Sequence, residues 1–479
     1  MRLAWAAVVA IRSAASLPRD PLMRHKVRGG FSPLRGATRT DGATGKGVTE
    51  EQERKGVALG IVALAGGCLT HVVLGSFYSI PTYVSYMSAK QQYFDPTKAG
   101  GKPDALYALS LTLLTSSMVM PFFARLASDV SAVGMSLLSG VVASLAVLLA
   151  SYATECWHFL LSHGVLFGVA HALGYTSPMV IGWRNFPNRR GLVSGVILLG
   201  FGCAASVWSP LATALANPDN VAPPFPASVR DRLAPTLRTL AGIYCFVSAA
   251  GVVALALGSP QKKTPATTKQ TKKDVLPHRS VVREALGSGP FWLAWGLCAM
   301  AASASLNVAT LYKGFAAAFG CDAVRADDRA LAVAGAVGAL GNGLGRLTWA
   351  ALSDVVGLKP TYLALLLVQT SAMLALGPAA LTGPRTFAAV LGLIFYTLGG
   401  CFSLSPPLAS ALFGPVDGPQ VYGMVFSAFP VASVAGNLVA TSIISRLGWQ
   451  ALLNILAATS VLAFLPLAGL RFPTTTTSS

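Results

Sequence analysis

Long apolar stretches separated by short polar ones dominate the pattern of this chain. Twelve of them reach the roughly 20 mostly apolar residues that a helix needs to cross the hydrocarbon core of a bilayer. They predict membrane-spanning helices near 57–84, 105–124, 132–152, 157–182, 191–214, 237–257, 291–313, 329–350, 360–380, 385–410, 419–445 and 449–470. The fold class predicted from this pattern is an all-α integral membrane protein with 12 transmembrane helices.

A polar segment in the middle of the chain divides the predicted spans into two sets of six. The pattern predicts a basic, disordered N-terminal tail at 1–55, a six-helix bundle at 56–258, a basic central loop at 259–288, a second six-helix bundle at 289–471 and a short C-terminal tail at 472–479. Arg2, Arg12 and Arg19 flank an apolar stretch, a pattern that is also typical of a targeting peptide. Residues 1–19 are therefore either part of the disordered tail or a targeting peptide.

Corresponding positions of the two sets resemble each other. Ser128-Asp129 follows the second predicted span and Ser353-Asp354 the eighth, at an offset of 225 residues, and Ser177-Pro178 ends the fourth as Ser405-Pro406 ends the tenth, at an offset of 228. Membrane carriers are often built from repeated halves with the substrate site at their interface. We therefore expect two pseudo-repeated bundles.

Composition excludes a water-soluble globule, because 53% of the residues are hydrophobic, 11% are charged and the mean hydropathy is +0.59. The net charge of +18 comes largely from 1–55, which contributes +6, and from 259–288, which contributes +5. The positive-inside rule then places both termini and the central loop in the cytoplasm. We expect the lipid bilayer, not nucleic acid, as partner, and a monomer in a plasma or organelle membrane.

The cysteine pattern offers no support for a metal centre or an enzyme. The seven cysteines are scattered, none forms a Cys-x-x-Cys pair, and no nucleophile motif or paired carboxylate motif occurs in the spans. We expect no catalytic residue, no metal and no cofactor.

Arg346 is the conspicuous charge inside a predicted span. An ionised side chain at mid-bilayer costs about 2.5–3.5 kcal/mol on insertion scales, so one that is present usually faces a cavity or a partner. Its planar guanidinium can bind a carboxylate through two parallel hydrogen bonds, and Asn342, four residues earlier, lies on the same helical face. The alternative is that Arg346 extends to the cytoplasmic interface or pairs with Asp354.

Three further charged residues are candidates for gating. Asp129 and Asp354 follow the second and eighth spans, where an aspartate can cap the next helix or engage an arginine across the turn, and Arg125 lies one helical turn before Asp129. A plain N-cap is the alternative role of each aspartate. Lys313, near the outer end of the seventh span, is expected to extend to the membrane surface.

Two motifs resemble the oxalate/formate antiporter-like and monocarboxylate-porter-like group of the major facilitator superfamily. The first runs from Gly174-Tyr175-Thr176-Ser177-Pro178 to Phe186-Pro187-Asn188-Arg189-Arg190-Gly191-Leu192, and the second comprises Leu412-Phe413-Gly414-Pro415 with Tyr422-Gly423. The resemblance covers roughly residues 56–471. It implies the major facilitator fold and a substrate-binding arginine at position 346.

The same resemblance implies a cavity lined by spans one, four and ten, where Tyr78, Tyr175, Tyr396 and Phe402 lie. Each of these could contact a small substrate or serve in packing. His71 and His171, in spans one and four, are candidates for proton coupling, because the ordinary pKa of a histidine is near physiological pH, and the alternative is a packed, hydrogen-bonded histidine.

Departures from the group's pattern bear on the substrate. Monocarboxylate/proton symporters tend to carry an aspartate where this chain has Asn342, which cannot titrate, and span one contains no lysine. We predict a secondary transporter of a small organic anion, preferably a monocarboxylate, working by alternating access with or without a co-transported or counter-transported ion. The alternatives are a carrier of a neutral or cationic solute and a transporter-like receptor or sensor.

Overall fold

The computed structural model describes residues 50–98, 102–129, 131–186, 190–259, 278–325 and 327–471. The chain divides into two units, Met1–Arg54 and Lys55–Ser479, and the elements discussed below belong to the second, apart from the first five residues of α2. Most of the predicted N-terminal tail, the middle of the predicted central loop, the C-terminal tail and part of the first sequence motif lie outside the described residues.

All regular structure in the described part of the N-terminal half, residues 55–257, is helical. Its elements are α2 (Glu50–Leu74), η2 (Gly75–Ser79), α3 (Ile80–Ser85), α4 (Ala89–Gln92), η3 (Pro96–Lys98), η4 (Asp104–Leu106), α5 (Tyr107–Asp129), α6 (Ala132–Ala150), α7 (Cys156–Phe159), the π-helical η5 (Leu160–Leu166), α8 (Phe167–Gly174), α9 (Ser177–Asn185), α10 (Arg190–Cys203), α11 (Ala205–Ala216), α12 (Ala227–Arg230) and α13 (Leu233–Leu257).

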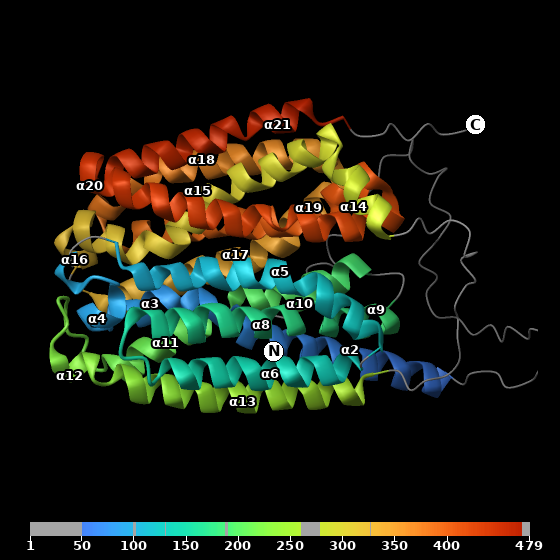
Figure 1. Cartoon of the computed structure of the whole chain (residues 1–479), viewed down its shortest axis with the longest axis horizontal. Coiled ribbons are helices and arrows are strands. Elements are labelled where there is room, and N and C mark those ends of the chain that lie inside the picture. The colour runs from blue at the N-terminus through green and yellow to red at the C-terminus, as the bar shows by residue number, and fades with distance from the viewer. Residues whose placement is uncertain are drawn as a thin grey trace, which may run out of the picture. The chain divides into compact units, whose positions relative to one another are not determined.

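The C-terminal half, residues 289–471, is helical in the same way. Its elements are α15 (Gly289–Phe319), α16 (Asp322–Arg325), α17 (Asp328–Val356), α18 (Leu358–Thr382), α19 (Pro384–Val425), α20 (Ala428–Leu462) and α21 (Phe464–Gly469). The long helices of both halves lie side by side and run roughly along one direction (Figure 1).

Ten helical segments of the described chain are long and apolar enough to cross a membrane, which confirms the predicted class of multi-pass helical membrane protein. The predicted count of 12 stays a prediction. One predicted span corresponds to a shorter apolar helix, Asp104–Met120, and two others lie within one segment, Val421–Gly469. That segment is interrupted at Gly448, whose φ of 82° is open to glycine at little cost.

The predicted central loop ends in a helix. Residues His278–Leu286 form α14, whose Val281 and Ala285 are buried and which packs against α19. An amphipathic helix of this kind is stabilised when its own apolar side chains are buried against a neighbouring helix. The charges of this segment alone predict a loop and do not reveal the helix.

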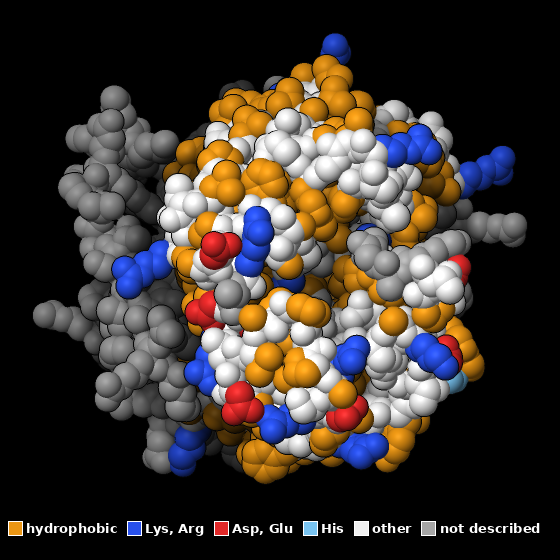
Figure 2. Space-filling view, turned by 90° about the vertical axis from the view of Figure 1, so that its left-hand side faces the viewer, with side chains coloured by type: hydrophobic (Ala, Val, Ile, Leu, Met, Phe, Trp, Pro, Cys, Tyr) orange, Lys and Arg blue, Asp and Glu red, His pale blue; other side chains and the backbone are white. Residues whose placement is uncertain are grey.

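Apolar side chains cover the outside of the helices. Leu137, Val141 and Leu145 of α6 and Phe246 and Val253 of α13 are all exposed, which in water would be costly and in lipid is favourable. Figure 2 looks onto the end of the helices near α4, α12 and α16, where Lys, Arg, Asp and Glu side chains are scattered between hydrophobic ones. The apolar sides and the charged end fit a protein embedded in a bilayer.

Several helix pairs join the halves of the chain, and two of them are α10 packed on α17 and α5 packed on α20. When the repeat offset of 225 to 228 is added to the residue numbers, α5 corresponds to α17, and α10 corresponds to the residues at the junction of α19 and α20. The two contacts are thus related by the same repeat that the sequence motifs indicate. The interface between the halves is formed by corresponding helices of each.

Glycines permit the closest helix approaches. A Cβ at Gly345 of α17 would overlap the carbonyl oxygen of Tyr396 on α19, and one at Gly343 would overlap the sulfur of Cys203 on α10. Small residues of this kind let helix backbones meet where the hydrophobic effect gives no drive for helices to associate. They bring α17 against both neighbours at the level of Arg346.

Replacing Gly345 by alanine should therefore destabilise the protein. The added methyl group would force α17 away from α19, at a cost of about 1–3 kcal/mol. Gly242→Ala is the matched control, because a Cβ at this exposed position of α13 meets nothing within 4 Å. Thermal unfolding in detergent should show a lower midpoint for Gly345→Ala and an unchanged or higher one for the control. Equal midpoints would contradict the packing argument.

Candidate functional site

Arg346 lies in the interior of the protein at the contact between the halves. It is 1% exposed, and its Cζ atom lies 4.9 Å from the ring centroid of Phe201 on α10 and 4.7 Å from that of Phe402 on α19. A cation over a desolvated aromatic ring gains about 2 kcal/mol. One ring comes from each half, so both halves hold the guanidinium.

The guanidinium neither reaches the membrane surface nor pairs with Asp354. Its Nε donates a hydrogen bond of 3.2 Å to Asn342 Oδ1, as the spacing of four residues predicts. Asp354 is exposed, and no ion pair between it and another described side chain is recorded.

Four buried hydrogen-bond donors at this place have no partner in the described structure. They are Nη1 and Nη2 of Arg346, Nδ2 of Asn342 and the hydroxyl of Tyr78. An unpaired buried donor costs about 1–3 kcal/mol, and more when the group is charged. Because all four can donate and one carries positive charge, their natural partner is an anion with several acceptor oxygens.

Tyr78 and Tyr175 complete this group, which we call the arginine cluster: Tyr78, Tyr175, Phe201, Asn342, Arg346 and Phe402. The phenol of Tyr78 lies close to both Asn342 and Arg346, and that of Tyr175 lies close to Arg346. The structure thus brings together five of the six residues that we proposed for substrate binding and adds Phe201.

The structure does not bring Tyr396 to the arginine cluster. Its hydroxyl accepts a hydrogen bond of 2.8 Å from Thr348 on the exposed side of α17, and its ring lies 5.3 Å from that of Trp349. Its backbone lies against Gly345, so the tight helix crossing fixes its side chain on the far side of α17. Tyr396 therefore lies apart from the arginine cluster, and its contact with substrate stays a prediction.

The two candidate histidines lie beside the arginine cluster and are fully buried or nearly so. Ring centroids of His71 and His171 lie 5.7 Å and 5.0 Å from that of Tyr175, and 6.2 Å and 5.3 Å from that of Phe201. Both are therefore close enough to respond to charge at Arg346.

The predicted cytoplasmic gate cannot be compared with the structure in full. Arg125 and Asp129 belong to the backbone of α5, but their side chains lie outside the described ones. The gating role of Arg125, Asp129 and Asp354 stays a prediction.

A second polar cluster joins the halves near the end of the helices that carries α4, α12 and α16. It consists of Tyr86, Asn217, Lys313 and Asp328, and we call it the interface cluster. Asp328 Oδ2 accepts hydrogen bonds from the Tyr86 hydroxyl at 2.5 Å and from Asn217 Nδ2 at 3.0 Å, while Lys313 Nζ lies 3.2 Å from Oδ1. Tyr86 and Asn217 come from the N-terminal half, and Lys313 and Asp328 come from the C-terminal half.

The interface cluster is deeply buried, with Asp328 2% and Lys313 8% exposed. Our expectation that Lys313 extends to the membrane surface is therefore wrong, because a buried carboxylate across the helix interface offers it a stronger partner. Burial, and then the negative charge of Asp328, raise the pKa of Tyr86 well above its ordinary value, so its hydroxyl remains a donor.

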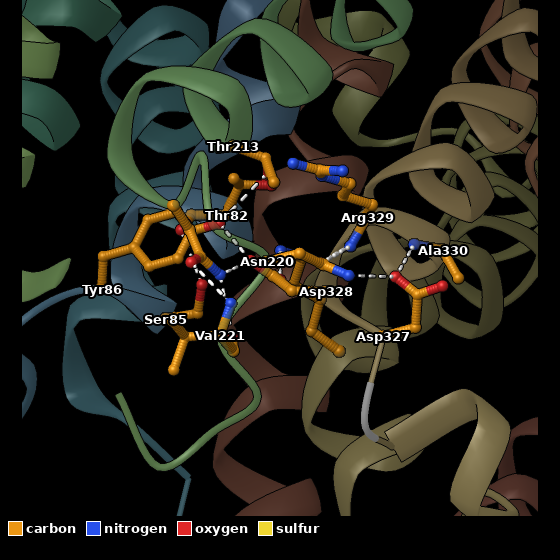
Figure 3. Close-up of polar contacts among 12 residues, drawn as sticks. Thr82, Ser85, Tyr86, Thr213, Asn220, Val221, Asp327, Asp328, Arg329 and Ala330 are labelled. Carbon is orange, nitrogen blue, oxygen red and sulfur yellow. Dashed lines mark hydrogen bonds and ion pairs between the residues drawn. The ribbon is translucent and has the colours of Figure 1, made fainter. Parts of the chain in front are cut away.

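Further contacts surround this cluster. Asn220 Nδ2 donates to Asp327 Oδ1 at 3.2 Å, Asn220 Oδ1 accepts from the backbone N–H of Arg329 at 3.0 Å, and the Arg329 guanidinium donates to the carbonyl of Pro218. Figure 3 shows Tyr86, Thr213 and Asn220 facing Asp327, Asp328 and Arg329 across the interface. A row of polar contacts closes the two halves against each other at this end.

Sequence reasoning missed Phe201 and the interface cluster. Phe201 stands between Gly200 and Gly202, and a Cβ at Gly202 would lie 2.6 Å from the Cα of Gly343. A phenylalanine between two glycines that allow close approach was thus an available signal. In the sequence, Asp327 and Asp328 resemble ordinary charges at the boundary of a span. No local sequence pattern distinguishes a buried aspartate from an exposed one at such a boundary.

Comparisons with known proteins identify transporters as relatives of this chain. The chain is 26% identical over 88% of its length to apicoplast pyruvate carrier 1 of Toxoplasma gondii, of which 89% is covered. It is 25% identical over 63% of its length to the oxalate:formate antiporter of Oxalobacter formigenes, of which 65% is covered. Further relatives are the MFS-type transporter YhjX of Escherichia coli, 24% identical over 78% of this chain, and monocarboxylate transporter 13 of Rattus norvegicus, 28% identical over 32% of this chain. No protein-family model matches the chain.

Among solved structures, the fold is similar to that of the nucleoside transporter NupG. The TM-score is 0.60 at 14% sequence identity, with 86% of this chain and all of that chain covered. Relatives along nearly the whole chain, the shared fold and the two motifs around Pro178 and Gly414 lead to one conclusion. The chain has the fold of major facilitator transporters, and its sequence resembles the oxalate/formate antiporter-like and monocarboxylate-porter-like group of that superfamily.

Proposed function

We propose that this protein is a secondary transporter of small monocarboxylate anions and works by alternating access between its two halves. The observation that carries the proposal is the buried guanidinium of Arg346, whose two Nη atoms have no partner at the contact between the halves. A charge in this position gains most from an anion that reaches it, because burial weakens the competition from water.

Carboxylate is the anion that fits this arrangement. Two parallel N–H groups of a guanidinium match the two oxygens of a carboxylate, and Asn342 and Tyr78 offer additional donors to the same oxygens. Pyruvate, oxalate and formate, the compounds in the names of two relatives, all carry this group.

One carboxylate is favoured over two. Besides Arg346, the buried cations of the described chain are Lys313 and Lys102, apart from histidines. Lys313 is paired with Asp328, and Lys102 lies 3.8 Å from the ring centroid of Tyr107. Burial lowers the pKa of Lys102 to about 7, so it is only partly charged at neutral pH. A second carboxylate would therefore lose its hydration without a free cation in return.

Alternating access is supported by the positions of the two clusters. The arginine cluster contains residues of both halves, so a bound anion would contact both. The interface cluster closes one end of the same interface through bonds that cross between the halves. Separation of the halves at that end requires these bonds to break, as rocking around a central site demands.

Substitution of Arg346 should abolish most carboxylate uptake. Arg346→Lys keeps the charge but loses the paired donors, and hydrogen bonds to charged groups contribute about 1.5–3 kcal/mol, so uptake of pyruvate or formate should fall about 10- to 100-fold. The control is Arg238→Lys, which changes an exposed arginine of α13. Initial rates are measured in proteoliposomes at equal protein content. Full uptake by correctly inserted Arg346→Lys would remove this residue from the site.

A panel of anions tests the preference for a single carboxylate. Formate and pyruvate should each compete with labelled pyruvate at least about tenfold better than oxalate, because the second charge of oxalate finds no free cation. Stronger competition by oxalate would contradict the preference. If no carboxylate exceeds background, the cargo is a neutral or cationic solute, and binding without flux would identify a receptor.

Weakening the interface cluster should open its end of the protein. Tyr86→Phe removes one bond across the interface, and Asp328→Asn removes the charge that three donors share. Loss of a hydrogen bond to a charged group shifts the balance between closed and open forms about tenfold or more.

Spin labels report this opening. They are placed at Ala227 of α12 and Ala323 of α16, which are exposed on the two halves, in a background without native cysteines. Distances between labels should lengthen in both variants but not in Asp322→Asn, which changes an exposed acid of α16. Unchanged distances in both variants would show that the interface cluster does not hold this end closed.

A further inference from the structure

His71 is bound in a way that a neutral histidine cannot satisfy. Its Nδ1 lies 3.0 Å from the carbonyl oxygen of Gly67 within α2, and its Nε2 lies 3.1 Å from the carbonyl oxygen of Tyr175. Both neighbours are acceptors, and a neutral imidazole carries one N–H group. In either neutral form one nitrogen lone pair therefore faces a carbonyl oxygen without a proton between them, and only the protonated ring donates to both.

The Tyr175 contact matters because it spans two membrane segments. Tyr175 lies at the break between α8 and α9, ahead of Pro178, where its carbonyl is outside both helices and needs a partner from elsewhere. His71 supplies that partner from α2. A proton on His71 thus strengthens the hold of α2 on the break that positions the phenol of Tyr175 beside Arg346.

The two other buried histidines of the N-terminal half lack such a pair of acceptors. Nδ1 of His171 lies 2.8 Å from the hydroxyl of Ser116, which itself donates to the carbonyl of Gly168, so Nδ1 carries the proton and Nε2 has no partner. Neither ring nitrogen of His163 has a partner. A second proton on His171, or on His163, would therefore create a buried N–H group without an acceptor.

Arg346 is the charged group that faces His71. The titratable groups around His71 are Cys68 and Tyr78 on its own segment, His171 and Tyr175 on the α8–α9 segment, Cys203 on α10 and Arg346 on α17. His71 and Arg346 both lie beside Phe201. The ring centroid of Phe201 is 6.2 Å from that of His71 and 4.9 Å from Cζ of Arg346. Burial, and after it the positive charge of Arg346, oppose a proton on His71, and a carboxylate bound to Arg346 would remove the second of these two effects.

We propose that His71 takes up the proton that accompanies a carboxylate anion onto Arg346, so that anion and proton bind together as a neutral pair. This inference rests on the proposed function. It gives a chain with Asn342, which cannot titrate, another side chain that could hold the proton. By thermodynamic reciprocity, the proton must also tighten binding of the anion by the same factor.

The size of this coupling follows from the separation of the charges. A unit charge about 10 Å away shifts a titration midpoint by about one pH unit at the effective dielectric constant of protein sites. Anion affinity should therefore rise up to about tenfold as the pH falls through the titration of His71. Uptake driven by an inward proton gradient should also be electroneutral and insensitive to membrane potential.

Titration calorimetry of the purified full chain measures the protons bound with each anion. Pyruvate and formate are titrated in pairs of buffers that differ in ionisation enthalpy, between about pH 5 and 8. The wild type should take up about half a proton per anion at the pH of its maximum, because a shift of one pH unit changes the protonated fraction of His71 by about half at most. His71→Gln, which keeps an amide donor for the Tyr175 carbonyl, should bind the anion with no proton uptake and no pH dependence of affinity. His163→Gln is the matched control and should behave as the wild type.

Each result decides a different point. Anion binding by the wild type without proton uptake would overturn this inference and leave the proposed function intact. Persistent uptake in His71→Gln, or its loss in His171→Gln alone, would place the proton elsewhere. If His71→Gln does not fold, His71→Asn replaces it with a smaller neutral amide. Failure of pyruvate, formate and oxalate all to bind would contradict the proposed function, and this inference with it.

Discussion

The structure depends on one buried charge whose hydrogen bonds are incomplete. Arg346 is enclosed by a ring from each half and bonded through Nε to Asn342, yet its two terminal nitrogens have no partner among the described residues. An unpaired guanidinium in the interior is costly, and a protein retains it where a ligand completes the bonds. The position between the halves makes that ligand a bridge whose arrival and departure affect both.

Close helix packing is what makes such a position possible. Gly343 meets α10 and Gly345 meets α19, so α17 approaches the N-terminal half and its own neighbour without intervening side chains. Phe201 and Phe402 can then reach the same guanidinium. The interface cluster adds directional bonds at one end of the same contact, where apolar packing alone would not distinguish an open from a closed form. In the proposed alternating-access cycle, glycine contacts would permit movement, whereas the ion pair and its donors would favour the closed arrangement.

Much of this could be predicted from the sequence. Apolar length predicts the helices, the spacing of four residues predicts the bond between Asn342 and Arg346, and family resemblance places Tyr78, Tyr175 and Phe402 near them. Phe201 was missed because an apolar ring in a span looks the same whether it faces lipid or a cation. Lys313 and Asp328 were missed because only the folded chain brings α15 and α17 together and places Tyr86 and Asn217 of the other half against them. Tyr396 lies on the side of α17 that faces away from the arginine cluster, because tertiary packing determines which side chains of α19 face the cluster.

A direct contact between substrate carboxylate and Arg346 is the central claim, and solid-state nuclear magnetic resonance can measure it. The full chain, with nitrogen-15 in its arginine guanidinium groups, is reconstituted with pyruvate carrying carbon-13 in its carboxylate. Paired hydrogen bonds of about 2.7–2.9 Å between nitrogen and oxygen predict dipolar coupling between the labels, lost in Arg346→Lys. Saturating pyruvate without such coupling, or coupling that survives Arg346→Lys, would contradict the account.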